Sequence, residues 1–393
     1  MVIFLSFLTR QIYLFFQGLV FVLMVLNQAS EGVDGTRIKS LQLEPNEVSL
    51  WGFNASQGFL LIGETVEGMK IDLTHQGNFS ISNPKIARLD GANRVVALQD
   101  GALILRAEFQ KFSVQTNIQI KGTNHKRPFS FARDIGGILT KRGCNNNECH
   151  GSVKGRGGLK LSVNGLYPKD DYRWIIKGGT YQVLSPEPLG TLRSRIDLKN
   201  PFQSLLLKKP ALELPHGGGQ RFSPQSADYK AILRWIQDGG SYGIDEEKNA
   251  ARIIRLEVLP REILLNSKGK QQLLVTAILA DGHREDVTNQ VHYESNNVDV
   301  AQVNDSGLIQ ANKLGETAVI IRASGYATTI SVGVIRESTH IYPNLVENNF
   351  IDHHIFGKLE KYRIMPSDLS NDVEFLRRIC LDLTGTLPPP EKT

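Results

Sequence analysis

Short alternations of apolar and polar residues fill two long stretches of the chain, residues 38–122 and 252–336. Runs such as Leu103-Ile-Leu105 and Val114-Gln-Thr-Asn-Ile118 are separated by turns rich in Gly, Asn and Asp. A period of two residues is typical of a strand with one buried face. Each stretch is therefore predicted to be an all-β sandwich.

The two stretches are copies of one sequence pattern. Leu41–Pro45 matches Leu256–Pro260, and the segment around Asp72-Leu-Thr74 matches the one around Asp286-Val-Thr288. The offset between matched positions stays between 214 and 216 residues, which a chance match would not hold. Asp72 and Asp286 are expected to form turns rather than to bind metal.

The second copy resembles the bacterial Ig-like domains of group 2. The matching phrases are Leu273–Ala277, Asp281-Gly282, Asp286–Thr288, Asn304–Ile309 and Gly315–Ile320. Asp-Gly and Ser-Gly supply hairpin turns, and alternating Val, Ile and Leu supply the inner faces. The resemblance implies spacer or adhesive modules without catalytic residues, with a surface protein or a glycan as the expected partner.

Between the copies, residues 126–245 change to a helical pattern. Residues 129–140 place apolar side chains on one face, and residues 226–237 carry a second apolar stripe. Ser226 is a candidate amino-terminal cap of the second helix, and Gly239 follows its end. A helix at each end predicts a small, mainly α domain with the arrangement of a small cytochrome c.

Residues 342–393 are predicted to begin a further helical domain that is truncated. Helical patterns cover residues 348–359 and 370–383. The adjacent pair His353-His354 points in two directions on a helix and is not expected to bind metal. Cys380 lies in an apolar helix and is expected to be a buried thiol.

The amino terminus has the layout of an export signal. Arg10 precedes an apolar run from Ile12 to Leu26, and Ala29, Ser30 and Gly32 follow it. Residues 1–32 are predicted to be a signal peptide or an amino-terminal anchor, and the run is shorter than the roughly 20 residues of a spanning helix. The protein is expected to be periplasmic, cell-surface or secreted, with membrane contact through this segment if it is uncleaved.

The net charge of +5 is unevenly distributed. Residues 126–243 hold 19 Lys and Arg against 9 Asp and Glu, a net charge of +10, so the rest of the chain carries −5. A basic middle segment suits an acidic redox partner or the propionates of a haem. Basic residues do not alternate with aromatic ones and no nucleic-acid motif occurs, so nucleic acid is not an expected partner.

The candidate chemistry lies in the middle segment, where Cys144 and Cys149 are followed by His150. Two cysteines ending in Cys-His are typical of covalent c-type haem, with the histidine as an iron ligand. The usual spacing has two residues between the cysteines, and this chain has four. Two alternatives stay open: a disulfide that closes a small loop, and a zinc site with one further ligand.

A second axial ligand of a haem iron is commonly Met or His. No methionine lies in residues 126–243, and the histidines there are His150 and His216. His216 is therefore the predicted second ligand, in the glycine-rich segment Leu214–Phe222, whose backbone can approach a flat cofactor closely. Lys154, Arg156 and Arg221 are candidate partners of the propionates.

Four phrases around this motif resemble large secreted proteins of planctomycetal bacteria. They are Arg142–Ser152, Gly157–Leu161, Pro201–Leu206 and Pro215–Phe222. Proteins of that family join a cytochrome-c-like segment and bacterial Ig-like domains to carboxyl-terminal domains of unknown function. The resemblance implies that Cys144, Cys149 and His150 are the haem-attachment positions.

The sequence thus predicts a multidomain protein: two Ig-like all-β sandwiches flanking a small mainly α cytochrome-c-like domain, followed by an incomplete α-helical segment. The predicted function is covalent haem c binding at Cys144, Cys149, His150 and His216, with one-electron transfer to an unidentified redox partner. The iron ligands would be His150 and His216. The alternative is a surface adhesion or scaffold protein without haem, and a small metal-binding module is a third possibility. No enzyme active site is visible in the sequence.

Overall fold

The computed structural model describes residues 37–178, 180–182, 185–189, 193–245, 252–323, 325–336 and 342–392. The predicted signal peptide or anchor, residues 1–32, lies outside the described residues. Strands make up 34% of the described residues and helices 22%. Among the described helices, none is long and apolar enough to cross a membrane.

The first sandwich (residues 38–121) contains ten strands in three sheets with the orders β1-β4-β5, β2-β10-β9-β6 and β3-β8-β7. Its strands are β1 (Ile38–Glu44), β2 (Val48–Trp51), β3 (Ser56–Gly58), β4 (Leu60–Thr65), β5 (Lys70–Asp72), β6 (Asn78–Ile81), β7 (Ala87–Asp90), β8 (Arg94–Ala97), β9 (Gly101–Phe109) and β10 (Phe112–Lys121).

The second sandwich (residues 253–335) repeats this arrangement strand for strand, with the orders β13-β16-β17, β14-β22-β21-β18 and β15-β20-β19. Its strands are β13 (Ile253–Leu259), β14 (Glu262–Asn266), β15 (Lys270–Gln272), β16 (Leu274–Leu279), β17 (Arg284–Asp286), β18 (His292–Ser295), β19 (Ala301–Val303), β20 (Leu308–Ala311), β21 (Gly315–Ala323) and β22 (Tyr326–Ile335).

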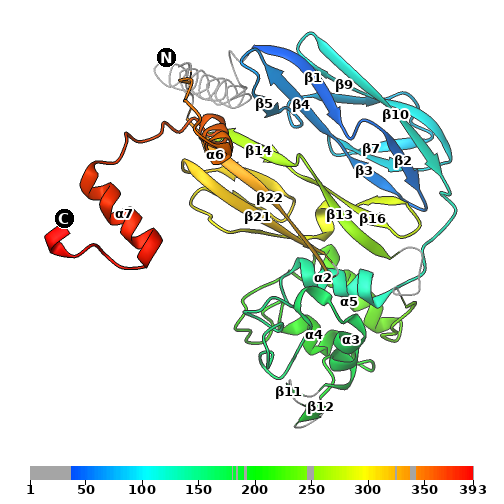
Figure 1. Cartoon of the computed structure of the whole chain (residues 1–393). Helices are drawn as coiled ribbons and strands as arrows, with labels where there is room; N and C mark the ends of the chain where they lie inside the picture. Colours follow the sequence, from blue (N-terminus) through cyan, green and yellow to red (C-terminus); the bar gives the residue numbers. More distant parts are fainter. Residues whose placement is uncertain are drawn as a thin grey trace, which may run out of the picture.

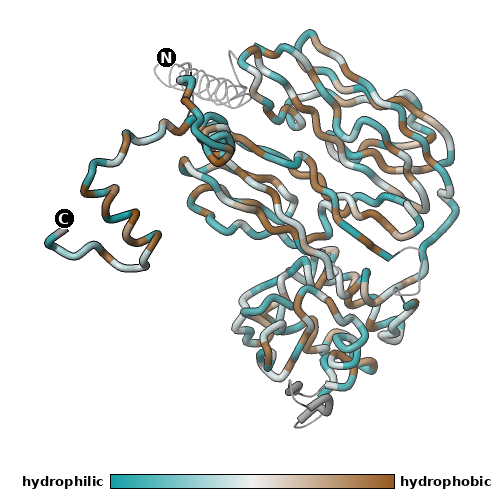
Figure 2. Tube along the Cα trace, in the orientation of Figure 1, coloured by the Kyte–Doolittle hydropathy of each residue, from teal (hydrophilic) through white to brown (hydrophobic). Residues whose placement is uncertain are grey.

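The predicted β-sandwiches and the internal repeat are therefore confirmed. The alternation of apolar and polar residues becomes an alternation of buried and more exposed positions, as along β9 and β21. Figure 2 shows hydrophobic and hydrophilic positions alternating along the strands of both sandwiches. Each sandwich closes over its own core of buried aliphatic side chains.

The two sandwiches pack directly against each other (Figure 1). Strand β16 is buried at every position, and β4 at nearly every one, so these strands are covered on both faces. One face of each strand belongs to its own core, and the other contributes to a shared cluster of Leu60, Ile62 and Leu274. Burial of this apolar surface favours a fixed pair of sandwiches.

Two aspartates connect the sandwiches in a nearly symmetric way. Asp286 accepts a hydrogen bond from the Gly58 N–H of the first sandwich at 2.6 Å, and Asp72 accepts one from the Gln272 N–H of the second at 2.6 Å. Gly58 and Gln272 are 214 residues apart, as are Asp72 and Asp286. Each sandwich thus presents the same donor and acceptor to its partner, which is the pattern of a two-fold interface.

Both aspartates also form the predicted turns. The second carboxylate oxygen of Asp72 accepts from the Thr74 N–H at 2.8 Å, and that of Asp286 accepts from the Thr288 N–H at 2.9 Å. The Asp286 side chain is fully buried and pairs with Arg94 of the first sandwich at 3.0 Å. One residue therefore fixes a local turn and a contact between sandwiches.

The cavity domain (residues 126–245) lies against the second sandwich, at the end away from the amino-terminal strands (Figure 1). Its helical segments are η1 (Phe131–Ile135), α2 (Gly136–Lys141), η2 (Val163–Gly165), α3 (Pro168–Lys177), η3 (Pro201–Gln203), α4 (Leu205–Lys208) and α5 (Ala227–Gln237), and β11 (Thr180–Gln182) pairs with β12 (Ser185–Leu189).

The prediction of a mainly α, cytochrome-c-like middle domain is wrong. The two predicted helices exist, but the described α-helices of this domain are short, from 4 residues in α4 to 11 in α5. Irregular segments rich in Gly and Pro connect them, and such residues do not continue a helix. The helical sequence patterns at the two ends of the domain therefore did not predict the irregular structure between them.

The carboxyl-terminal residues form the two predicted helices, α6 (Phe350–Lys361) and α7 (Asp372–Thr384), and the short η6 (Pro390–Lys392). After α6, the buried Tyr362 donates a hydrogen bond to Glu316 of β21 at 3.2 Å. Helix α7 lies away from the sandwiches and has no buried residue. Cys380 on α7 is partly exposed, so the prediction of a buried thiol is wrong.

Replacing Asp286 with Ala is expected to destabilise the protein by about 3–5 kcal/mol, because the change leaves the partly buried Arg94 and the Gly58 N–H without their acceptor. The free energy of unfolding in urea measures the effect. Asp299→Ala is the matched control, since its pair with Lys313 is exposed and should cost less than about 1 kcal/mol. Equal losses in the two variants would contradict the role of Asp286.

Candidate functional site

An apolar cavity of about 220 Å³ lies inside the cavity domain, between the loop that follows α2 and the segment before α5. A single water molecule needs about 10–15 Å³ by the same kind of measure, so the space is large enough for an organic group. All four residues predicted from the sequence line it: Cys144, Cys149, His150 and His216.

The loop after α2 brings three of these residues together. The Cys144 N–H bonds to the Leu139 carbonyl at 2.9 Å, which carries the chain out of the helix. The His150 N–H then returns to the Cys144 carbonyl at 3.0 Å. Gly151 follows, where any Cβ would collide with the Asn145 carbonyl oxygen. The tight loop therefore requires glycine directly after the histidine.

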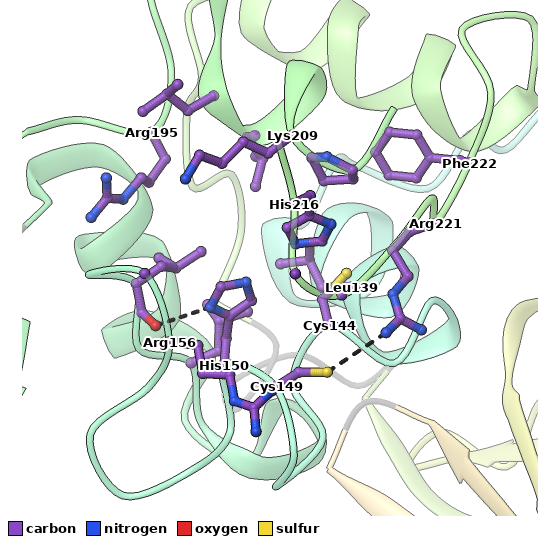
Figure 3. A pocket seen from close by; sticks show the side chains of 18 of the residues that line it. Leu139, Cys144, Cys149, His150, Arg156, Arg195, Lys209, His216, Arg221 and Phe222 are labelled. Atoms are coloured by element: carbon purple, nitrogen blue, oxygen red, sulfur yellow. Dashed lines mark hydrogen bonds between the residues drawn. The ribbon is translucent and has the colours of Figure 1, made fainter. Parts of the chain in front are cut away.

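The two histidines are arranged as a pair (Figure 3). Their rings are 6.3 Å apart between centroids and inclined by 15°. Nδ1 of His150 lies 3.1 Å from the Leu159 carbonyl oxygen, and Nδ1 of His216 lies 2.7 Å from the Gly219 carbonyl oxygen. A carbonyl can only accept, so each Nδ1 carries a proton.

Electrostatics favour a neutral His150. Burial lowers its pKa, and the neighbouring His216 lowers it further. A neutral imidazole whose Nδ1 donates to a backbone carbonyl is the usual state of a metal-ligating histidine.

The two cysteines differ in their surroundings. Cys144 is buried within the apolar core of the cavity domain, and burial raises the pKa of its thiol to about 12. Cys149 is partly exposed, with the guanidinium Nη2 of Arg221 at 3.7 Å from its sulfur (Figure 3). Both thiols are free, so the disulfide alternative is not the state that the structure shows.

Four cationic side chains line the cavity: Arg156, Arg195, Lys209 and Arg221. Sequence reasoning proposed Arg156 and Arg221 but missed Arg195 and Lys209, which come from segments far from the motif. Lys154, which was also proposed, is not among the lining residues. An apolar space lined by cations suits a largely apolar ligand that carries negative charge.

A buried carboxyl supports the wall behind His150. The Leu161 N–H bonds to the His150 carbonyl at 2.8 Å. The next residue, Ser162, donates both its N–H and its hydroxyl to Asp171 of α3, at 2.5 and 2.7 Å. Burial raises the pKa of Asp171 to about 7. Sequence reasoning missed this residue, because one Asp in the first turn of a helix is common.

No group of three or more His, Cys, Asp or Glu side chains in the described residues could hold a metal ion. The predicted zinc alternative at Cys144, Cys149 and His150 is therefore not assembled in this structure. A haem iron is a different case, because the porphyrin supplies four ligands and the protein only one or two.

No family model matches the chain, and no curated protein matches it. Solved structures similar to it include domains 5–6 of the S-layer protein SbsC, with 10% identity, a TM-score of 0.31, and coverage of 77% of this chain and 100% of that one. Invasin, a bacterial integrin-binding protein, has 10% identity, a TM-score of 0.16, and coverage of 75% and 38%. Human protocadherin-24 EC1-2 has 8% identity, a TM-score of 0.15, and coverage of 77% and 100%.

These TM-scores lie below the level of a shared overall fold. The proteins named are surface-layer, integrin-binding and protocadherin structures. The predicted classification of the chain as cytochrome-like is wrong, because strands make up 34% of the described residues and helices 22%, and the cavity domain is not mainly α.

Asp171 is expected to make stability depend on pH. Its pKa is about 7 when folded and about 3.9 in an unfolded chain, so its favourable contribution is complete below pH about 4 and is lost as the pH rises to about 7. Asp171→Asn, which cannot ionise, should remove this loss. Urea unfolding of both proteins at a series of pH values from 4 to 8 tests it, and parallel curves would contradict the assignment.

Proposed function

We propose that this chain is an exported surface scaffold or adhesion protein, in which a fixed pair of Ig-like sandwiches carries the cavity domain at one end. The observation that carries the proposal is the buried contact between the sandwiches, made by Asp72, Asp286 and the shared apolar cluster. A linker of independent modules would not need such a contact, whereas a rigid support does.

The cavity domain is fastened to the same support. Arg133 of η1 forms an ion pair with Glu285 of β17, and Arg142, just after α2, pairs with Asp305 of the second sandwich at 2.9 Å. The Gly325 N–H of the second sandwich bonds to the Asn164 carbonyl at 2.7 Å. These contacts support a single frame that presents the cavity outward. Exposed faces of the sandwiches would meet a surface protein or a glycan.

Rigidity is testable with two spin labels carried by p-acetylphenylalanine at the exposed positions Val66 and Val298, one on each sandwich. The scaffold proposal expects one narrow distance distribution between them in the full chain. The double change Asp72→Ala and Asp286→Ala should broaden it, because both crossing hydrogen bonds are lost. A broad distance distribution in the chain that keeps both aspartates would contradict the rigid frame.

Surface location needs its own measurement. Proteinase K added to intact cells that express the full chain should remove the protein while a cytoplasmic marker survives. Protection of the chain until the cells are lysed would rule out a surface role.

A second candidate function is binding of a c-type haem in the cavity, favoured by the two histidines and two cysteines that line it. The rings of His150 and His216 lie 6.3 Å apart between centroids. Cys144 and Cys149 line the same space, where their thiols could form thioethers with a porphyrin.

The chain's own residues would have distinct roles in this second candidate. His150 and His216 would hold the group, each with its Nδ1 fixed by a backbone carbonyl. Arg156, Arg195 and Lys209 would meet the negative charge of propionates. A bound haem would supply one-electron transfer, and the basic cavity domain would then favour an acidic redox partner.

The haem candidate is tested by expressing the full chain with a periplasmic haem-ligation system and recording the pyridine haemochrome spectrum after denaturation. Covalent haem stays with the chain and gives a thioether-type spectrum. His216→Ala should convert a low-spin native spectrum to high-spin, because one axial ligand is lost. His75→Ala, at an exposed position of the first sandwich, is the control. A colourless protein would eliminate haem and leave the scaffold proposal standing.

A further inference from the structure

Four cationic side chains surround the cavity without a carboxylate to balance them. Arg156, Arg195, Lys209 and Arg221 line it, and the described lining residues include no Asp or Glu. None of the four side chains forms an ion pair with a carboxylate in the described part of the chain. Unpaired charge beside an apolar space is costly, so the cavity favours an anion.

Arg195 is held in the cavity wall by its backbone and by one nitrogen of its side chain. Its N–H donates to the Ile175 carbonyl of α3 at 2.8 Å, and its carbonyl accepts from the Leu206 N–H of α4 at 2.9 Å. Nη2 donates to the carbonyl of Gly158, where a Cβ would lie only 3.2 Å from this nitrogen. Three separate segments of the cavity domain therefore position the guanidinium.

One donor of this guanidinium has no acceptor. Nε of Arg195 is buried and forms no hydrogen bond with the described residues. A buried donor without an acceptor destabilises the folded chain, and more so when the group is charged. A carboxylate fits a guanidinium well, because its two oxygens match neighbouring N–H groups. It also suits an apolar space better than a phosphate group, because it brings less negative charge out of water.

Lys209 adds a second charge beside an apolar wall. It directly follows α4, and its amino group extends to the side of the cavity on which Arg195 lies (Figure 3). The apolar part of the lining consists mainly of leucines, with one aromatic ring: Leu139, Leu159, Leu161, Leu205, Leu206 and Phe222. A ligand that fits both features has an apolar body and a negatively charged end.

We propose that the cavity binds an organic carboxylate with an apolar body. Nε of Arg195 donates to a carboxylate oxygen, and the amino group of Lys209 pairs with the same charge. The body of the ligand lies against the leucines of the wall, so that its burial contributes to affinity. Binding is non-covalent and needs neither a metal ion nor a thiol.

This inference goes beyond the scaffold proposal, because it assigns a class of ligand to the cavity domain. It also stands apart from the haem candidate, since it rests on Arg195 and Lys209 rather than on the histidines or the cysteines. A colourless protein in the haemochrome test would eliminate haem and leave the binding of a carboxylate unaffected. The two proposals therefore fail in different experiments.

Two pairs of probes test the proposal, each with one apolar body that carries or lacks carboxylate charge. They are 2-naphthoate with its methyl ester, and metal-free protoporphyrin IX with its dimethyl ester. Probe fluorescence with the haem-free full chain should show at least tenfold tighter binding of the acid than of the ester in one pair, a preference that one hydrogen bond to a charged group can supply. A preference for naphthoate assigns a small organic acid, whereas one confined to protoporphyrin assigns a porphyrin. Equal binding of acid and ester in both pairs, or no binding at all, would overturn the proposal.

Variants of the two cations locate the carboxylate group. Arg195→Met should weaken binding of the acid by about tenfold and leave binding of the ester unchanged, because only the charged end loses its donor. Lys209→Met should weaken the acid by a smaller factor, about threefold, since it removes one charge without a fixed donor. Lys154→Met is the matched control: it removes the same charge from the same domain, at an exposed residue that does not line the cavity.

Thermal melting confirms that each variant is folded. Should Arg195→Met fail to fold, Lys209→Met decides the question, because the Lys209 amino group forms no hydrogen bond with the described residues and its loss should leave the fold intact. Unchanged binding of the acid in the folded variants, or an equal loss of acid and ester, would refute the carboxylate site at Arg195 and Lys209.

Discussion

The arrangement of the whole molecule depends on two carboxylates that cross between the sandwiches. Asp72 and Asp286 each use one oxygen for a turn and the other for a backbone N–H of the opposite sandwich. Because the same residue serves both purposes, the turn cannot be kept without placing an acceptor at the contact surface. Buried charge is costly unless it is hydrogen-bonded. The fully buried Asp286 therefore needs Gly58 and Arg94 of the first sandwich to satisfy its carboxylate.

This constraint reaches the cavity through the second sandwich. The strand that ends at Asp286 also carries Glu285, whose carboxylate pairs with Arg133 at the start of the cavity domain. A few residues further on, His292 contacts the loop around Cys144. One short segment of the second sandwich thus contacts the first sandwich, the first helix of the cavity domain and the loop that lines the cavity. The site is held from outside its own domain.

Sequence reasoning predicted what depends on local periodicity. The alternation in the two copies indicated the strands, and the apolar stripes of residues 129–140 and 226–237 indicated helices at the right places. Because few ligand-type residues occur in the middle segment, elimination left His216 as the predicted partner of His150, and the two rings lie close together in the structure. Sequence reasoning failed where glycine and proline interrupt the pattern, because an irregular segment has no periodicity from which its fold can be predicted. The mainly α prediction extended the two ends of the domain across such a region.

Contacts between distant segments were beyond the reach of the sequence. Asp286 looks like any residue of a hairpin turn, and the local pattern does not show that its second carboxylate oxygen bonds to the other sandwich. His292 stands in an ordinary strand, where alternation assigns a face but cannot name the loop that the side chain meets. The repeat held one usable signal: two copies that carry the same turn aspartate 214 residues apart can form a two-fold contact with each other. An internal repeat therefore encodes a self-complementary surface in its amino-acid sequence, provided that the two copies pack face to face.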